Sequence, residues 1–372
     1  MARKSPKRTP VAPPLTVAPP YPPSWINRFA DWVDRLPGAS AAYYVGAALL
    51  LAGLQWSIQM TGSRSADSFN LLVAITIPYE LGLMHYLLRT SAGSLEEFRP
   101  ALRASAHEAE DLRYRLTVLP SRPALWAAAG VTVVSSGFVA ISYLLDRAGL
   151  ASWLPGGFAF PDFPAVFHIA PTVPSVGLTA LILIGAWWAT GTYAYLMFHQ
   201  LRTISLIYSR HTEIRVFRLG PLYAFSRHTL RSALGLLLLA YGLFAVAPEV
   251  ILSPLGQGSW LLLITGAVAT FLFPLWGIHR HLVREKEYML HEAGRRMEAG
   301  VAELHRRMDQ NELARMDDLN KALASLEIER AALERVPSWP WERGTLRSLV
   351  AALVLPIVIW LVQQVLQPLL SR

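Results

Sequence analysis

The sequence of 372 residues contains no cysteine and is poor in charge, with 16% Asp, Glu, Lys and Arg. The missing cysteine excludes a disulfide framework, a thiolate metal site and a thiol nucleophile. Catalytic signatures are missing as well: the sequence has no Gly-x-Ser-x-Gly nucleophile turn, no Walker-type phosphate loop and no zinc-protease helix. We therefore predict no enzymatic activity, no cofactor and no metal site.

Hydrophobic residues make up 53% of the chain, and they gather in seven apolar segments. Each segment has about 20 residues, which is the length that a helix needs to cross about 30 Å of hydrocarbon. We predict an all-α, polytopic membrane bundle with spans at 41–61, 69–88, 124–145, 175–198, 233–253, 259–279 and 347–368. The pattern from Val176 to Arg210 continues past the fourth span without proline. This predicts a helix that projects into the cytoplasm.

The basic residues predict the orientation of the bundle. Of the 34 Lys and Arg residues, all but Arg64, Arg147 and Arg372 lie on one side of the predicted spans. Because positively charged connections stay in the cytoplasm, we predict a cytoplasmic N-terminus and a C-terminus outside. The net charge of +8 fits attraction to anionic lipid and requires no nucleic acid. The excess of arginine over lysine indicates a GC-rich prokaryote, so we expect the inner or plasma membrane.

The segments outside the spans differ in composition. Residues 1–23 are rich in proline, lysine and arginine, cannot bury enough apolar surface to fold, and are predicted to be a disordered cytoplasmic arm. The amphipathic pattern from Trp25 to Leu36 predicts a short helix along the inner interface. Residues 24–280 then form the membrane domain, in which 213–217 alternate like a short strand. Residues 337–372 contain a re-entry segment and the last span.

Between the last two spans, apolar residues recur at the four-three spacing of a coiled coil, with a break in phase between Met308 and Met316. One helix from His279 to Arg335 would be about 85 Å long, and the residues up to Leu346 return at most roughly 37 Å. The chain must therefore reverse. We predict a cytoplasmic helical hairpin over 281–336, with a turn at the polar stretch 309–312.

One acidic residue lies deep in an apolar run: Glu80, two residues after Pro78. A carboxylate there costs several kcal/mol unless it is neutralised, paired or hydrated, so Glu80 is a candidate proton or cation site. The alternative is a protonated Glu80 that is hydrogen-bonded to a neighbouring tyrosine, tryptophan or threonine. His85, and Gln363 and Gln364 in the last span, complete the candidate polar site, and the two glutamines serve either pore lining or contact between helices.

Aromatic residues are concentrated in the fourth span. Trp187, Trp188, Tyr193 and Tyr195 occupy middle-to-inner positions at which lipid-facing helices usually carry leucine. We predict a candidate aromatic cavity for an apolar or cationic ligand, with packing in the core as the alternative.

Together these features favour a channel or transporter for a solute or ion, forming a homo-oligomer in the lipid bilayer through its hairpins. One alternative is a membrane sensor or scaffold whose coiled-coil hairpin, 281–335, binds a cytoplasmic protein partner. Another is an intramembrane enzyme that acts on lipids, which would require Glu80 and the histidines at the inner ends of the spans, namely His85, His199, His228, His279 and His281. The order of seven spans and a cytoplasmic helical layer is similar in outline to the insect odorant and gustatory receptor channels. The similarity concerns the order of elements only, and no residue is assigned from it.

Overall fold

The computed structural model describes residues 19–62, 68–147, 173–246, 254–310, 316–342, 344–355 and 358. Within these ranges the chain is nearly all helical and has no β-strand, only the isolated bridges Pro23–Pro120 and Leu102–Thr212. The helices are α1 (Trp25–Asp34), α2 (Ser40–Gly62), α3 (Ser68–Phe98), η1 (Arg99–Ala101), α4 (Ala106–Thr117), α5 (Ser121–Arg147), α7 (Val173–Arg210), η3 (Gly220–Leu222), α8 (Tyr223–Val246), α10 (Pro254–Asp309) and α11 (Met316–Arg335).

The segment at 213–217 is not a strand, so that prediction is wrong. The backbone N–H of Glu213 donates to the carbonyl of Ala101 at 2.8 Å, and the N–H of Arg103 donates to the carbonyl of His211 at 2.8 Å. These bonds hold an irregular connection against η1 and satisfy its polar groups without a ladder.

Five of the described helices are long and apolar enough to cross a membrane, which indicates a membrane protein. They are Ser40–Met60, Asn70–Ala101, Ser121–Ile141, Gly177–Arg210 and Trp260–Asp309. These helices overlap the predicted first four spans and the sixth. The predicted fifth and seventh spans run beyond the described ranges, which contain α8 to Val246 and a shorter apolar helix, Gly344–Leu355.

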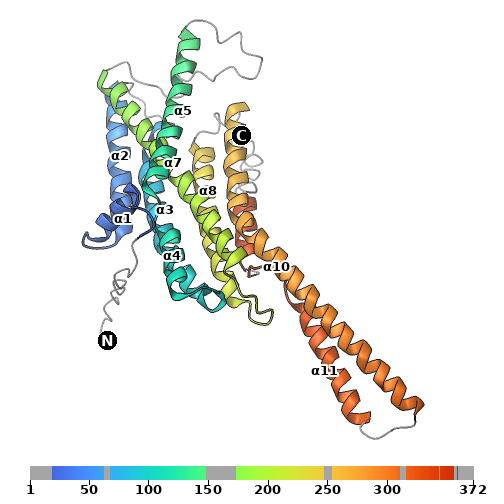
Figure 1. The fold of residues 1–372 in the computed structure, drawn as a ribbon. Coiled ribbons are helices and arrows are strands. Elements are labelled where there is room, and N and C mark those ends of the chain that lie inside the picture. The colour runs from blue at the N-terminus through green and yellow to red at the C-terminus, as the bar shows by residue number, and fades with distance from the viewer. Residues whose placement is uncertain are drawn as a thin grey trace, which may run out of the picture.

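Helix α7 is central in the bundle, and α2 lies at its edge (Figure 1). In the most apolar stretch of α7, 50% of the residues are buried inside the bundle, whereas in that of α2 only 6% are. α7 packs against α3, α5 and α10, and α3 also packs against α2 and α8. As predicted, α7 continues as one helix to Arg210, beyond its apolar part.

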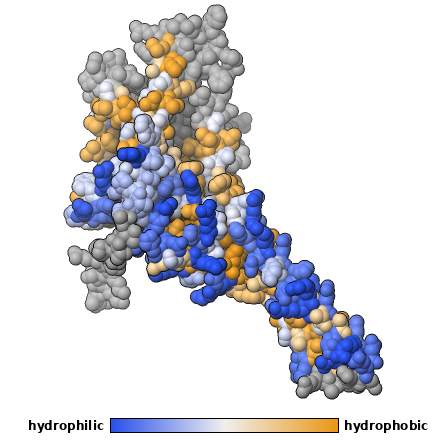
Figure 2. Space-filling model, in the orientation of Figure 1, coloured by the Kyte–Doolittle hydropathy of each residue, from blue (hydrophilic) through white to orange (hydrophobic). Residues whose placement is uncertain are grey.

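The bundle divides into an apolar part and a hydrophilic part along its length. Figure 2 shows hydrophobic residues over the upper part of the visible face, and hydrophilic residues over the lower part and over α10 and α11. The exposed apolar residues include Leu49, which is 70% exposed, and Val134, which is 72% exposed. Large apolar side chains at such exposure require an apolar environment, which a bilayer supplies.

Helix α10 continues out of the bundle, and α11 runs back beside it (Figure 1). Lys286 Nζ donates to the backbone carbonyls of Glu334 and Val336 at 2.7 and 2.9 Å. These are free carbonyls at the end of α11, where a cation is favoured. The polar stretch at which the phase of the apolar pattern breaks falls between the two helices, and residues 311–315 lie outside the described ranges.

After α11 the chain returns to the middle of α10 through a stack of aromatic rings. Trp339 stacks on His279 with centroids 3.8 Å apart, and Trp341 stacks on Trp339 at 4.3 Å. Trp341 also stacks on Phe271 at 5.6 Å. The re-entry segment is therefore fixed to α10 by face-to-face ring contacts.

The predicted disordered arm, 1–23, lies largely outside the described ranges, which begin at residue 19. Its last residues pack against the connection between α4 and α5: Tyr21 Oη donates to the carbonyl of Val118 at 2.9 Å, and Tyr114 Oη donates to the carbonyl of Tyr21 at 2.6 Å. This contact places the start of α1 inside the protein.

Candidate functional site

Glu80 lies in α3, and its side chain is fully buried against α7. The hydroxyl oxygen of Thr190 lies 2.9 Å and 3.1 Å from the two carboxylate oxygens, and it donates to them. Among the ion pairs of the described residues, none involves Glu80. One neutral hydroxyl does not balance a buried carboxylate, so the group requires a proton or a cation.

Further polar groups surround this acid. Tyr79 Oη donates to the carbonyl of Gly235 in α8 at 2.6 Å, which joins α3 to a third helix. Tyr193, one turn after Thr190, has a buried hydroxyl with no hydrogen-bond partner among the described residues. Pro78 has no N–H and leaves the carbonyl of buried Ala74 without its helical donor. The site thus combines an acid with the spare hydroxyl of Tyr193, while the freed carbonyl of Ala74 lies more than one turn away on α3.

Four polar residues of α7 lie on one face of that helix. Their spacing of 11, 3 and 7 residues is close to whole helical turns. They are Thr179, Thr190, Tyr193 and Gln200. Each of three has a partner on another helix: Gln55 donates to Thr179 at 3.3 Å, Thr190 donates to Glu80, and Gln200 lies 3.2 Å from His228. The buried face of α7 therefore carries a polar row through the bundle.

An apolar layer lies where α1 meets the bundle. Ile26 of α1 is fully buried and shares one cluster with Met84, Leu119, Tyr193 and Leu196. Helix α1 forms as predicted, and Ile26, Ala30 and Val33 of its apolar face are buried against protein.

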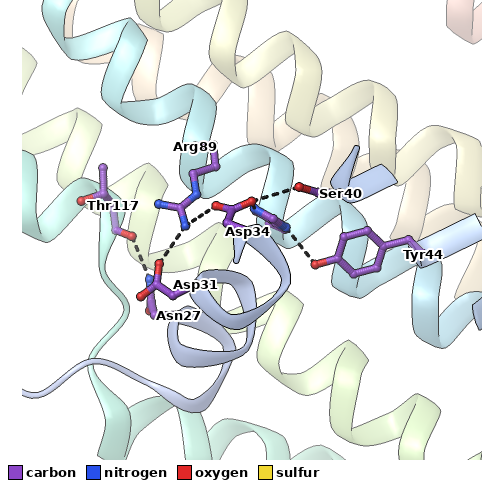
Figure 3. Close-up of polar contacts among 8 residues, drawn as sticks. Asn27, Asp31, Asp34, Ser40, Tyr44, Arg89 and Thr117 are labelled. Carbon is purple, nitrogen blue, oxygen red and sulfur yellow. Dashed lines mark hydrogen bonds and ion pairs between the residues drawn. The ribbon is translucent and has the colours of Figure 1, made fainter. Parts of the chain in front are cut away.

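A polar network joins α1 to α3 and α2 (Figure 3). His85 is 4% exposed, and its Nε2 lies 3.0 Å from Asp34 Oδ1. Its Nδ1 lies 2.9 Å from Tyr44 Oη. Ser40 Oγ donates to Asp34 Oδ1 at 3.0 Å. Both imidazole nitrogens are therefore engaged, one by an acid and one by a hydroxyl.

Arg89 supplies the countercharge of this network. Its Nη2 lies 2.7 Å from Asp31 Oδ1 and 2.5 Å from Asp34 Oδ2. Desolvation acts to raise the pKa of Asp34, but the hydrogen bond from Ser40 and the charge of Arg89 outweigh it, so the pKa lies below its ordinary value. Asp34 is therefore ionised at neutral pH and binds α1 to α3.

Asn27 fixes the other side of α1. Its Nδ2 donates to the carbonyl of Thr117 at 3.0 Å, and its Oδ1 accepts from the N–H of Leu119 at 2.9 Å (the Thr117 bond is drawn in Figure 3). Ser24 Oγ also donates to Oδ1 at 2.9 Å. These bonds satisfy backbone groups at the connection between α4 and α5.

The structure divides the predicted polar site in two. Glu80 and His85 are five residues apart, so they point about 140° apart on α3; Glu80 contacts α7, and His85 contacts α1 and α2. Gln363 and Gln364 lie outside the described ranges.

The four aromatic residues of the predicted cavity share no single face of α7. Tyr193 is buried, and Trp187, Trp188 and Tyr195 are half-buried. At 100° per residue, Tyr193 points about 160° away from Tyr195. Of these four aromatic residues, only Tyr193 belongs to the polar row of α7.

Sequence reasoning missed Thr190, Asp34 and Arg89, which are the partners of Glu80 and His85. One signal for Asp34 was present. A carboxylate in the last turn of a helix is disfavoured by the helix dipole, so Asp31 and Asp34 near the end of the predicted amphipathic helix required a cation from elsewhere.

Comparison with known proteins supplies no family for this chain. The function is therefore inferred from the buried acid, the polar row and the network of α1. No protein-family model, no curated protein and no solved structure matches the sequence.

Proposed function

We propose that this protein is a multi-pass membrane channel or transporter with seven spans and a cytoplasmic N-terminus, in which Glu80 binds the proton or cation that moves. The observation that carries this proposal is the burial of Glu80: it is 0% exposed inside a membrane-length helix, and the Thr190 hydroxyl is its one hydrogen-bond partner among the residues that the structure describes. Ionisable residues at such positions mark ion pathways and proton relays.

Of these two classes, a transporter is better supported than an open channel. The layer around Ile26 and Leu119, both fully buried, separates Glu80 from the end of the bundle at α1. A site that is closed on one side and lined by a proline-interrupted helix is typical of alternating access. Displacement of α1 would open this side of the bundle.

The test is flux through proteoliposomes under an imposed pH or cation gradient. Glu80→Gln keeps the shape of the side chain and removes its acid, so we expect loss of flux. The matched control is Glu96→Gln, on the same helix but exposed and paired with Arg99, and it keeps wild-type flux. Unchanged flux in Glu80→Gln removes Glu80 from the mechanism, and no flux for any cation in the wild type removes the class.

The second candidate is a sensor or scaffold whose hairpin binds a partner. It is favoured by the arms of α10 and α11, which project from the bundle and have a largely hydrophilic surface (Figures 1 and 2). Tyr288 and Ile328 are 67% and 71% exposed on these arms and are suited to contacts with another subunit or protein. Deletion of 281–335 would then abolish association while the bundle stays folded, and unchanged association would refute it.

A further inference from the structure

A groove with a volume of about 560 Å³ runs between α2 and α3, under the end of α1. Its long part is apolar, and it ends at polar groups. The apolar part includes Ala41, Val45 and Ala48 of α2 and Ile75 and Leu83 of α3; the polar end includes Asp34, His85 and Arg89.

The groove opens on the outer face of the bundle. Val45 is 59% exposed, Tyr86 is 48% exposed, and α2 is the least buried of the membrane-length helices. From Ile75 to Arg89 the groove follows α3 for about 21 Å, at 1.5 Å per residue. Half of the hydrocarbon thickness is about 15 Å, so the groove matches one leaflet and places Arg89 near the level of the headgroups.

Groups at the polar end are available to a ligand. Both ion pairs of Arg89 use Nη2, so within the described ranges Nε and Nη1 have no protein partner and can donate to a phosphate. Asp31 is paired through Oδ1, which leaves Oδ2 for an ammonium group. Both oxygens of Asp34 are occupied, by Ser40, His85 and Arg89. An unused guanidinium edge thus lies beside an unused carboxylate oxygen.

Asp31 does not line the groove itself, but it pairs with Arg89 at the polar end. Together with Asp34 it gives two carboxylates for one guanidinium, and this excess of negative charge disfavours a purely anionic headgroup. A phosphate alone would meet that negative charge, whereas a phosphate followed by an ammonium matches both Arg89 and Asp31. The ligand is therefore a zwitterion with an apolar tail.

We propose that this groove binds one phospholipid of the inner leaflet whose headgroup carries a primary ammonium, as phosphatidylethanolamine does. The acyl chain lies along Val45, Ala48 and Ile75. The phosphate accepts from Arg89, and the ammonium donates to Asp31. Because the lipid also borders Asp34, it stabilises α1 on the bundle. The inference requires insertion in a bilayer, and it holds whether or not Glu80 takes part in transport.

The experiment uses the full chain in nanodiscs made of equal parts of phosphatidylethanolamine, phosphatidylcholine and phosphatidylglycerol. The protein is then released into detergent, and retained lipid is identified by native mass spectrometry. We expect the wild type to retain the ethanolamine lipid. Ala48→Trp fills the groove, and we expect retention to fall about tenfold or more, the change that about 1.4 kcal/mol produces. The matched control is Leu49→Trp, on the exposed side of α2 and outside the groove, and it retains lipid as the wild type does.

Asp31→Asn tests recognition of the headgroup separately from binding of the acyl chain. Asp31 is half or more exposed, so the variant folds, and we expect it to lose the preference for ethanolamine over glycerol headgroups. Equal retention in wild type and Ala48→Trp overturns the site. Wild-type preference for phosphatidylglycerol, or equal retention of choline and ethanolamine lipids, overturns the headgroup assignment. A wild-type dimer without lipid, which Ala48→Trp dissociates, shows that a second copy covers the groove and overturns the proposal.

Discussion

Asn27→Ala removes the bonds that fix α1 to the connection between α4 and α5. The side chain is 8% exposed and satisfies the Thr117 carbonyl and the N–H of Leu119, a residue that is 0% exposed. A buried polar group left without its partner costs about 1–3 kcal/mol. Two such groups, one of them only part-buried, weaken the docking of α1 by about 3 kcal/mol.

This loss predicts a local effect. Because each 1.4 kcal/mol is a factor of ten, the undocked population of α1 rises about a hundredfold. Hydrogen exchange read by mass spectrometry follows such local opening. We expect exchange in Trp25–Asp34 to accelerate by about this factor at unchanged pH, while α7 keeps its protection.

Arg28→Ala is the matched control, because Arg28 lies exposed on the same helix. It keeps wild-type exchange in α1. Wild-type exchange of α1 in Asn27→Ala would contradict the assigned hydrogen bonds. A uniform acceleration over the whole chain would also refute the reasoning, because it would show that α1 and the bundle open as one unit.

Three further predictions concern packing, pH and the arms. Gly191→Ala brings a Cβ to 2.7 Å from the carbonyl oxygen of Ala127, so the α5 backbone must move. We expect the free energy of unfolding, measured by thermal unfolding, to fall by about 1–3 kcal/mol. The control is Gly53→Ala, whose Cβ meets nothing within 4 Å and which has a far smaller effect. Because the pKa of Asp34 lies below the ordinary 3.8, its ion pairs stabilise α1 fully above pH 3.8, and this stabilisation is lost as the pH falls through the lowered pKa. We expect a spin label on α1 to become mobile in that acid range. A label that stays immobile there contradicts the assignment. Lys286→Ala removes two hydrogen bonds to carbonyls at the end of α11, at a cost of about 1 kcal/mol. We expect the distribution of spin-label distances between α10 and α11 to broaden. An unchanged distribution would show that apolar contacts suffice to hold the two helices together.

The long helices could be predicted because hydropathy and the absence of proline are local properties of the chain. The pattern from Val176 to Arg210 gave the end of α7 to the residue. The end of α3 was missed: the apolar run stops at Leu88, but the helix continues to Phe98. Thr90 and Ser94 follow the apolar run, and their hydroxyls bond carbonyls of the preceding turn, so they are accommodated within the helix.

The site could be predicted only in part. Glu80 is visible in the sequence because a charge in an apolar run is costly wherever the run folds. Its partner Thr190 is 110 residues away, and a threonine in a span has no distinguishing signal. Asp34 meets His85 and Arg89 only because α1 folds back against α3, and that depends on tertiary packing and not on local pattern.

The most direct test of the membrane bundle uses the absence of cysteine, since every introduced cysteine is then the only thiol. Met308→Cys, at the far end of α10, and Arg64→Cys, between the first two predicted spans, are labelled in intact cells with an impermeant maleimide. The proposed topology predicts that the cysteine at position 64 reacts from outside and the one at position 308 reacts only after the membrane is permeabilised. Reaction of both from the same side would contradict the orientation and the placement of Glu80 between two aqueous compartments.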